Sequence, residues 1–280
     1  MHSSLVALAV DSFLREDLGF GDITTESIFT GREMATARLV AKQPCIAAGA
    51  GSVAALVFAR INPATGIHAA IADGASVSAG EVLLEVAGPT ADLLQAERVA
   101  LNLLQRLCGI ATLTRAFVEK ISGSRAKIVD TRKTTPGLRH LEKYAVRVGG
   151  GNNHRFSLAD GILIKDNHIA ACGSIARAVE RVRKRAPHTL RIEVEAATLS
   201  QVRECLDSRV DVIMLDNMPP ALMREAVALI GGRALVEASG NVTLATVAEV
   251  AATGVDLISV GALTHSAPAC DISMRLLSSP

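Results

Sequence analysis

The chain has 280 residues, of which 49% are apolar and 20% are charged, so it can bury a sizeable core and is not intrinsically disordered. It carries 29 lysines and arginines against 28 aspartates and glutamates, and only 2% of its residues are aromatic. This balance argues against a dedicated nucleic-acid-binding protein, which needs excess positive charge and aromatic platforms for base stacking. The 5 cysteines contain no CxxC pair, which argues against a zinc cluster and is typical of free thiols in a reducing compartment.

The first part of the chain combines helical and strand patterns. Residues 1–17 are expected to form an amphipathic helix and not a signal peptide, because acidic residues directly follow a short apolar run. Residues 34–43 alternate like a strand, and residues 73–88 are expected to be paired strands separated by glycine turns. A long helix is predicted over 91–121, with Arg98 away from its leucine stripe. No run reaches the ~20 apolar residues of a membrane span, so we expect a cytoplasmic protein without membrane contact.

From residue 126 onwards, short β-branched runs alternate with helical patterns. The predicted strands are 126–131, 161–166, 190–195, 210–216, 234–239 and 256–261. Helices that open with Ser, Thr or Pro are predicted over 174–186, 198–208, 219–232 and 243–254. Repeated βα units predict a parallel sheet. Because this region is short for a complete barrel of ~250 residues, we expect an incomplete α/β barrel.

Positive charge is concentrated between residues 132 and 165, where seven lysines and arginines stand against two acids. Three of these cations belong to a helix predicted over 138–150, in which they are expected to be solvated and to pair with Glu142. The other four are Arg132, Lys133 and Lys165, which follow strand ends, and Arg155, which lies in the glycine-rich run 148–156 beside His154. With His154, the candidates are Arg132, Lys133, His154, Arg155 and Lys165. We expect these five to converge on an anion, because guanidinium forks and ammonium groups suit carboxylates and phosphates. An ordinary loop with water-facing basic residues is the alternative for 148–156.

Polar residues also follow the later strands. Glu195 and Asp216 each end an apolar strand and face the same mouth, with Glu193 one layer deeper. Such carboxylates could neutralise the cations, bind sugar hydroxyls or hold Mg²⁺. Barrels often bind phosphate after their last two strands. The residues at that place are Ser239, Gly240, Asn241 and Gly261. An ordinary turn glycine is the alternative for the last of them.

Residues 130–169 resemble the central segment of the quinolinate phosphoribosyltransferase family, also called nicotinate-nucleotide pyrophosphorylase (carboxylating). The matching run is DTRKTTPGLRHLEKYAVRVGGGNNHRFSLADGILIKDNHI, and the shorter runs EDLGFGDITTE, AERVALNLLQRLCGIATLT, IEVEA, VIMLDN and VEASGNV match in the family's order. The resemblance implies an open-faced α/β sandwich over 1–108, joined by 264–280. It further implies an incomplete, TIM-like α/β barrel over 109–263 that carries the active site.

The resemblance also implies a reaction. Quinolinate and phosphoribosyl pyrophosphate would give nicotinate mononucleotide, pyrophosphate and CO₂, with Mg²⁺, in de novo NAD biosynthesis. Members of the family are dimers or larger assemblies, and the resemblance leaves a homodimer and a hexamer both open for this chain.

Each candidate residue receives a role by this resemblance. The clamp for the quinolinate dicarboxylate is expected to comprise Arg132, His154, Arg155, Lys165 and the partner subunit's Arg98. Lys133 and Lys165 are expected to face the pyrophosphate, and Glu195 and Asp216 the ribose hydroxyls and Mg²⁺. These four are the expected catalytic residues. Ser239, Gly240, Asn241 and Gly261 are expected to bind the 5′-phosphate.

Three other functions remain compatible with the residues. A barrel lyase or aldolase could use Lys165 or Lys133 as a Schiff-base lysine. A divergent paralogue could keep the fold and handle molybdate or another anion. A non-enzymatic binding module is the third alternative, and it would need no metal-binding carboxylates.

Overall fold

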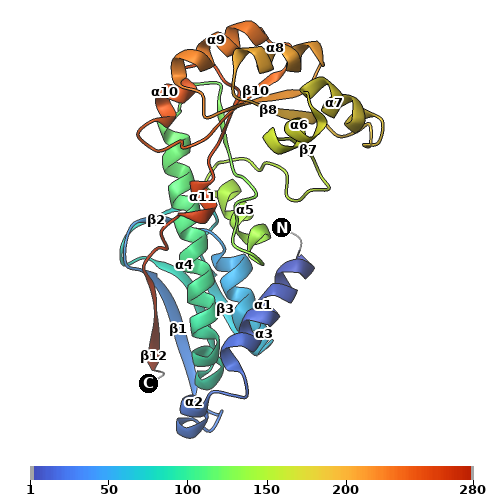
Figure 1. Ribbon diagram of the computed structural model, residues 1–280. Coiled ribbons are helices and arrows are strands. Elements are labelled where there is room, and N and C mark those ends of the chain that lie inside the picture. Colours follow the sequence, from blue (N-terminus) through green and yellow to red (C-terminus); the bar gives the residue numbers. More distant parts are fainter. Residues whose placement is uncertain (1–2, 279–280) are drawn as a thin grey trace. The chain divides into compact units, whose positions relative to one another are not determined.

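The computed structural model of the chain describes residues 3–278, which form two compact units (Figure 1). Unit 1 contains the residues up to Arg115, the segment Thr134–Gly150 and the residues from Thr264 onwards, and unit 2 contains Ala116–Lys133 and Gly151–Leu263. The domain boundary predicted from the sequence is at residue 108, whereas residues 109–115 and 134–150 belong to compact unit 1. Residues 1–2 and 279–280 of the predicted first domain lie outside the described residues.

Unit 1 is built on an antiparallel sheet in the order β12-β1-β5-β3. These strands are β1 (Met34–Ala41), β3 (Gly66–Ala70), β5 (Val82–Pro89) and β12 (Ile272–Ser278). Ala37 and Leu39 of β1 are fully buried, whereas Arg38 between them is exposed and pairs with Glu85 on β5. This period-two alternation shows that one face of the sheet is covered and the opposite face carries charged side chains.

The pairing predicted within residues 73–88 is wrong. The short strand β4 (Ser76–Val77) pairs with β2 (Cys45–Ile46), whereas β5 pairs with β1 on one side and β3 on the other. A two-residue strand offers β5 few ladder hydrogen bonds, but β1 extends along almost the whole of β5. Strand β5 therefore pairs with strands that are distant in sequence, and not with β4 across the nearby glycine turn.

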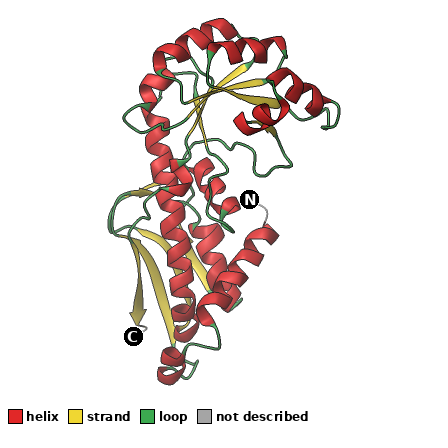
Figure 2. Ribbon diagram, viewed as in Figure 1, coloured by secondary structure: helices red, strands yellow, loops and turns green. Residues whose placement is uncertain are grey.

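Unit 1 also contains helices, of which the longest lies beside this sheet (Figures 1 and 2). They are α1 (Ser3–Leu18), α2 (Ile23–Ile28), the π-helix η1 (Ala50–Ala54), α3 (Ala55–Ile61), α4 (Thr90–Lys120, whose last turn belongs to unit 2) and α5 (Arg139–Val148). The short helix α11 (Ala262–His265) stands where the chain passes from unit 2 to unit 1. Leu101, Leu104 and Leu107 of α4 are buried, as the predicted stripe requires, and Arg98 is exposed.

Helix α5 belongs to unit 1 because of a buried ion pair. The carboxylate of Glu142 is only 1% exposed, and its Oε1 lies 2.6 Å from a terminal guanidinium nitrogen of Arg106 on α4. Its Oε2 accepts a hydrogen bond from the backbone N–H of Thr135 at 3.1 Å. Glu142 therefore pairs with a cation of α4, and not with one of its own helix as expected. The expected exposure holds for Arg147 but not for Lys143, which is fully buried.

The end of the chain returns to α4. The backbone N–H of Cys270 donates to the Gln105 carbonyl at 3.0 Å, and the Gln105 side chain donates to the Ile272 carbonyl at 2.8 Å. A Cβ on Gly109 would lie 2.0 Å from the Pro268 carbonyl oxygen, so only glycine permits this approach. The returning segment then forms β12, which pairs antiparallel with β1.

Unit 2 is a parallel six-stranded sheet in the order β6-β11-β10-β9-β8-β7. The strands are β6 (Lys127–Val129), β7 (Ile162–Ile164), β8 (Ile192–Ala196), β9 (Val212–Asp216), β10 (Leu235–Ser239) and β11 (Leu257–Ser259). The helices are α6 (Asp166–Cys172), α7 (Ile175–Arg183), α8 (Leu199–Asp207), α9 (Pro220–Ile230) and α10 (Val247–Ala251). Ser174 and Thr198 cap the helices α7 and α8 by accepting backbone N–H groups, as their positions in the sequence predicted.

The sheet of unit 2 is an incomplete barrel. Its outer strands β6 and β7 are not paired with each other in the described part of the chain, and Asn152 instead forms an isolated bridge with Val129 of β6. The predicted fold class, an α/β protein with an incomplete barrel, is confirmed. Because all six strands run parallel, their carboxyl ends meet at one edge, which positions the site. Within residues 3–278, no helix has the length and apolar character to cross a membrane.

Candidate active site

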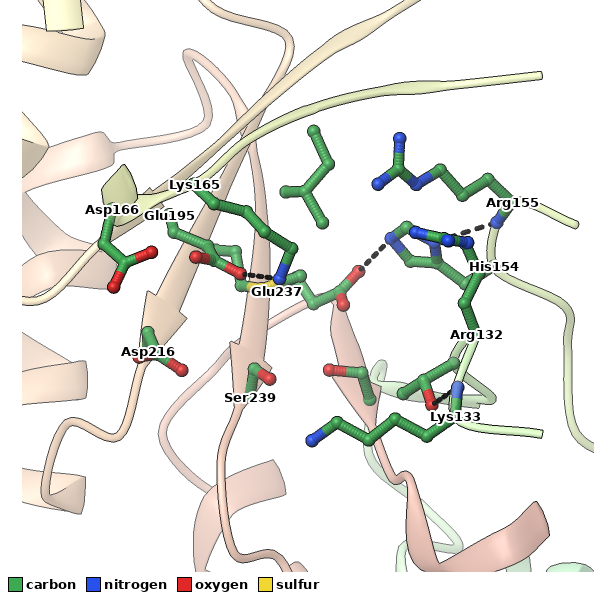
Figure 3. A pocket seen from close by; sticks show the side chains of 14 residues that line it. Arg132, Lys133, His154, Arg155, Lys165, Asp166, Glu195, Asp216, Glu237 and Ser239 are labelled. Atoms are coloured by element: carbon green, nitrogen blue, oxygen red, sulfur yellow. Dashed lines mark hydrogen bonds and ion pairs between the residues drawn. The ribbon is translucent and has the colours of Figure 1, made fainter. Parts of the chain in front are cut away.

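A cavity of about 490 Å³ opens at the carboxyl ends of the strands of unit 2 (Figure 3). Its lining is Thr131, Arg132, Lys133, His154, Arg155, Leu163, Lys165, Asp166, Glu195, Met214, Asp216, Glu237, Ser239 and Ser259. Residues two apart on a strand share a face, so each strand contributes a deep and a shallow side chain. Glu237 and Ser239 of β10 are such a pair. Eight of the residues predicted from the sequence lie in this one lining.

The cations come from three separate segments. Arg132 and Lys133 follow β6, Arg155 follows the glycine-rich loop, and Lys165 follows β7 at the start of α6. Arg155 donates from its guanidinium to the Gly161 carbonyl at 2.8 Å. Partial burial and the neighbouring positive charge of Arg132 lower the pKa of Arg155. The cavity therefore holds cations that repel one another, and a bound anion would relieve this repulsion.

Two carboxylates face these cations. Glu195 and Asp216 stand at the ends of the adjacent strands β8 and β9, and both line the cavity. The ammonium group of Lys165 lies 2.7 Å from Glu195 Oε1. Asp216 accepts a hydrogen bond from the side chain of Asn217 at 3.1 Å. These oxygen donors sit in a place where a divalent cation or the hydroxyls of a sugar could bind.

A buried acidic cluster forms the floor of the cavity. Nε2 of His154 lies 2.9 Å from Glu193 Oε2 and 3.9 Å from Glu237 Oε2, and the three residues offer atoms within 4.8 Å of one another. Burial first, and then the charge of Glu193, raise the pKa of Glu237 to about 8. These three groups lie close enough together to bind a metal ion or to share a proton.

The sequence analysis missed Glu237. Glu193 was expected one layer below Glu195, and the same period-two argument applied to β10 would have placed Glu237 below Ser239. The alternation of Glu237 and Ser239 in the run VEASGN is the signal that predicts it.

The predicted phosphate-binding residues are only partly at this cavity. Ser239 lines it, whereas the lining does not include Gly240, Asn241 or Gly261. Gly240 has a φ of +103°, and a Cβ there would lie 2.1 Å from Asn217 Oδ1. Asn241 donates from its side chain to the same oxygen at 3.3 Å. Arg98 lies on α4 in unit 1.

Comparison with known proteins identifies the family of this chain. The family profile described as "Quinolinate phosphoribosyl transferase, N-terminal domain" matches residues 22–108, and the profile of the C-terminal domain matches residues 110–275. The chain belongs to the quinolinate phosphoribosyltransferase family.

Relatives in several organisms resemble this family member over most of its length. It is 50% identical over 266 residues to the "Probable nicotinate-nucleotide pyrophosphorylase [carboxylating]" of Bacillus subtilis, covering 95% of this chain and 91% of the relative. It is 45% identical to the "Nicotinate-nucleotide pyrophosphorylase [carboxylating]" of Mycobacterium leprae, with 94% of each chain covered. The crystal structure of NadC from Streptococcus pyogenes superposes with a TM-score of 0.96 at 41% identity, covering 100% of this chain and 99% of that one.

Two features of the cavity also argue against the alternative functions. A Schiff-base lysine must present a neutral amine, whereas Lys165 stands in an ion pair with Glu195. A simple anion-binding module needs no pair of carboxylates opposite its cations, and this cavity has Glu195 and Asp216 there. The chain is a phosphoribosyltransferase by family.

Proposed function

We propose that this protein transfers the phosphoribosyl group of phosphoribosyl pyrophosphate to quinolinate with loss of CO₂, giving nicotinate mononucleotide and pyrophosphate for NAD biosynthesis. One observation carries the proposal. A single cavity sets the cations of Arg132, Lys133, Arg155 and Lys165 against the carboxylates that end β8 and β9. These are the charges that a dicarboxylate, a pyrophosphate and a ribose diol require in a common site.

The dicarboxylate clamp is built from fixed positive charge. Arg132 and Arg155 present planar forks that match a carboxylate, and Lys165 adds a point charge. Burial and the positive charge of Arg132 lower the pKa of Arg155, and a bound dianion would offset that charge. His154 also lines the cavity, and its ring contacts Glu193 of the buried acidic cluster.

Glu195 and Asp216 fit a magnesium ion by their chemistry. Mg²⁺ prefers oxygen donors and is usually held by one or two carboxylates together with substrate phosphates. Both residues offer such oxygens at the ends of neighbouring strands. When bound there, Mg²⁺ would supply positive charge to the pyrophosphate as it leaves. The same two carboxylates can accept hydrogen bonds from the ribose hydroxyls.

The reaction requires positioning more than a nucleophilic side chain. The bond between C1 of the ribose and the pyrophosphate oxygen breaks with its electron pair going to pyrophosphate, and the lone pair of the quinolinate nitrogen bonds to C1. We expect Lys133 and Lys165 to stabilise the departing charge, and Ser239, Gly240, Asn241 and Gly261 to hold the 5′-phosphate. The carboxylate next to the quaternised nitrogen then leaves as CO₂, and its electron pair on the ring carbon takes up a proton.

The proposal extends to assembly and location. We expect a homo-oligomer, either a dimer or a hexamer, in which the partner subunit's Arg98 completes the clamp. Arg98 is exposed on a helix whose neighbouring leucines are buried, which supports a role outside its own core. All five cysteines are free thiols, which supports a reducing compartment such as the cytoplasm.

The test is an assay of the purified protein with quinolinate, phosphoribosyl pyrophosphate and Mg²⁺. We expect CO₂ and nicotinate mononucleotide in equal amounts, and no product when nicotinate replaces quinolinate. Arg132→Ala should weaken quinolinate binding by about 30-fold or more, because a charged hydrogen-bonding partner is lost. The matched control is Arg191→Ala, which removes an exposed arginine of the same unit. No turnover of quinolinate by the wild type, or unchanged quinolinate affinity in Arg132→Ala, would contradict the proposal.

A further inference from the structure

Both ring nitrogens of His154 are engaged at the edge of the cavity. Nδ1 accepts a hydrogen bond from the backbone N–H of Arg155 at 2.8 Å, as Figure 3 shows. Nε2 lies 2.9 Å from Glu193 Oε2. A ring nitrogen that accepts a hydrogen bond carries no proton, so the proton of His154 lies on Nε2 and is donated to Glu193. The geometry is that of a neutral imidazole in one defined tautomer.

The backbone around His154 is tied to the end of β6. Its N–H donates to Asp130 Oδ1 at 2.9 Å, and the fully buried Asp130 also accepts from the side chain of Asn153 at 2.5 Å. Asn152 exchanges backbone hydrogen bonds with Ile128 and Asp130, at 2.8 and 3.1 Å. The glycine-rich loop therefore ends in a rigid segment, and Arg155 leaves from that segment toward the cavity.

Glu193 and Glu237 lie under this segment with few polar neighbours. They are 7% and 1% exposed, on β8 and β10, and each has one carboxyl oxygen, Oε1, that is buried without a hydrogen-bond partner. The hydrogen-bond partners of Glu237 are Ser259 and Glu193, and a protonated Glu237 donates to Glu193. Burying two carboxyls costs more than burying apolar side chains of the same size. Their presence in the barrel core therefore points to a task that apolar residues could not perform.

We propose that Glu193 and Glu237 are positioning residues for the dicarboxylate clamp. Glu193 holds the imidazole of His154 by accepting the hydrogen bond from Nε2, and Glu237 acts through its contact with Glu193. His154 in turn holds the backbone from which the guanidinium of Arg155 reaches the substrate. In this arrangement the positive charge of the clamp comes from Arg132, Arg155 and Lys165, and His154 supplies geometry. The inference rests on the proposed function, because it assigns the cavity to a dicarboxylate.

Kinetics of two Glu193 variants test the positioning role. Glu193→Met keeps the length of the side chain but removes the acceptor, and we expect it to raise the KM for quinolinate about tenfold or more while the KM for phosphoribosyl pyrophosphate stays within about twofold. Glu193→Gln retains an acceptor oxygen and should raise the quinolinate KM less. Glu180→Gln, which changes an exposed carboxylate of α7, is the control. Equal effects on both substrates, or none on either, would overturn the proposal.

Nitrogen NMR of the His154 ring tests the same network without turnover. In the wild-type enzyme near neutral pH we expect a neutral ring with its proton on Nε2, and Glu193→Met should lose this tautomer preference. A protonated Nδ1 or a doubly protonated ring in the wild type would overturn the proposal, even if the variants did not fold. A wild-type enzyme that shows this tautomer but does not bind quinolinate would instead refute the proposed function, and with it the assignment of the network to a dicarboxylate clamp.

Discussion

The ammonium group of Lys165 lies 2.7 Å from the carboxylate of Glu195, across the carboxyl ends of the neighbouring strands β7 and β8. The Lys165 side chain is 45% exposed and that of Glu195 15%, so water screens the pair and it adds little to the stability of the fold. Its position at the mouth of the cavity gives it a chemical use instead. Lys165 can turn toward an anionic substrate, and Glu195 is then available to a ribose or a metal ion.

Glu195→Gln should therefore impair catalysis far more than folding. Loss of this carboxylate removes one of the two charged oxygen donors at the ends of β8 and β9, and we expect kcat/KM for phosphoribosyl pyrophosphate to fall about 100-fold. The melting temperature should change little. Steady-state kinetics at several Mg²⁺ concentrations and thermal denaturation provide the two measurements. A variant that keeps the wild-type Mg²⁺ dependence would show that Glu195 has no part in metal or ribose binding.

Gly240→Ala should disturb the loop that follows β10. The new Cβ would lie 2.1 Å from Asn217 Oδ1, and the residue would keep a φ of +103° that alanine rarely adopts. We expect a loss of about 1–3 kcal/mol in the free energy of unfolding, together with weaker binding of phosphoribosyl pyrophosphate.

The control for this steric effect is Gly80→Ala. Gly80 also has a positive φ, +91°, but a Cβ there meets no atom within 4 Å. Backbone strain is thus common to both variants, and only Gly240→Ala adds the collision with Asn217. If the two variants lose the same free energy of unfolding and both keep the wild-type affinity for phosphoribosyl pyrophosphate, the collision with Asn217 has no effect on stability or binding.

Subunit mixing tests whether Arg98 acts in the site of a partner. Arg98→Ala and Glu195→Gln should each be nearly inactive as homo-oligomers. In a mixed oligomer, the intact Arg98 of one subunit can meet the intact Glu195 of the other, so part of the activity should return. Differently tagged subunits, purified as heterodimers, permit the measurement. Absence of any recovery in proven heterodimers would show that Arg98 does not act in the site of the partner.

The titration of Glu237 predicts a pH dependence of stability. Its pKa is about 8 in the folded protein against an ordinary value of 4.5, so between these values the folded state binds more protons than the unfolded state. The stability that the neutral Glu237 carboxyl contributes is therefore complete below pH 4.5 and is lost as the pH rises through about 8. Glu237→Gln stays neutral throughout and should lack this slope.

Thermal denaturation of both proteins from pH 5 to 9 measures the difference. The melting temperature of the wild type should fall relative to that of Glu237→Gln across this range. Glu249→Gln, which changes an exposed carboxylate of α10, should run parallel to the wild type. Parallel curves for Glu237→Gln as well would show that Glu237 is ionised in the folded protein.

The sequence by itself determined the local elements and the chemical types at the site. Alternating β-branched and helical runs predicted the six parallel strands of unit 2, because each βα unit needs a short apolar strand and a capped helix. The ends of those strands also located Arg132, Lys165, Glu195 and Asp216, because the carboxyl ends of parallel strands meet at one edge.

Only the tertiary structure decided which distant segments meet. Helix α5 joins unit 1 through the ion pair of Glu142 with Arg106, although the sequence offered Glu142 nearer cations on its own helix. Likewise, Glu237 becomes part of the floor because the strand order places β8 and β10 on either side of β9, so that both carry a carboxylate to the same imidazole. Periodicity along the chain reports which face of a strand or helix is apolar. It does not report which partner covers that face, because the partner is selected by packing and electrostatics among residues far apart in sequence.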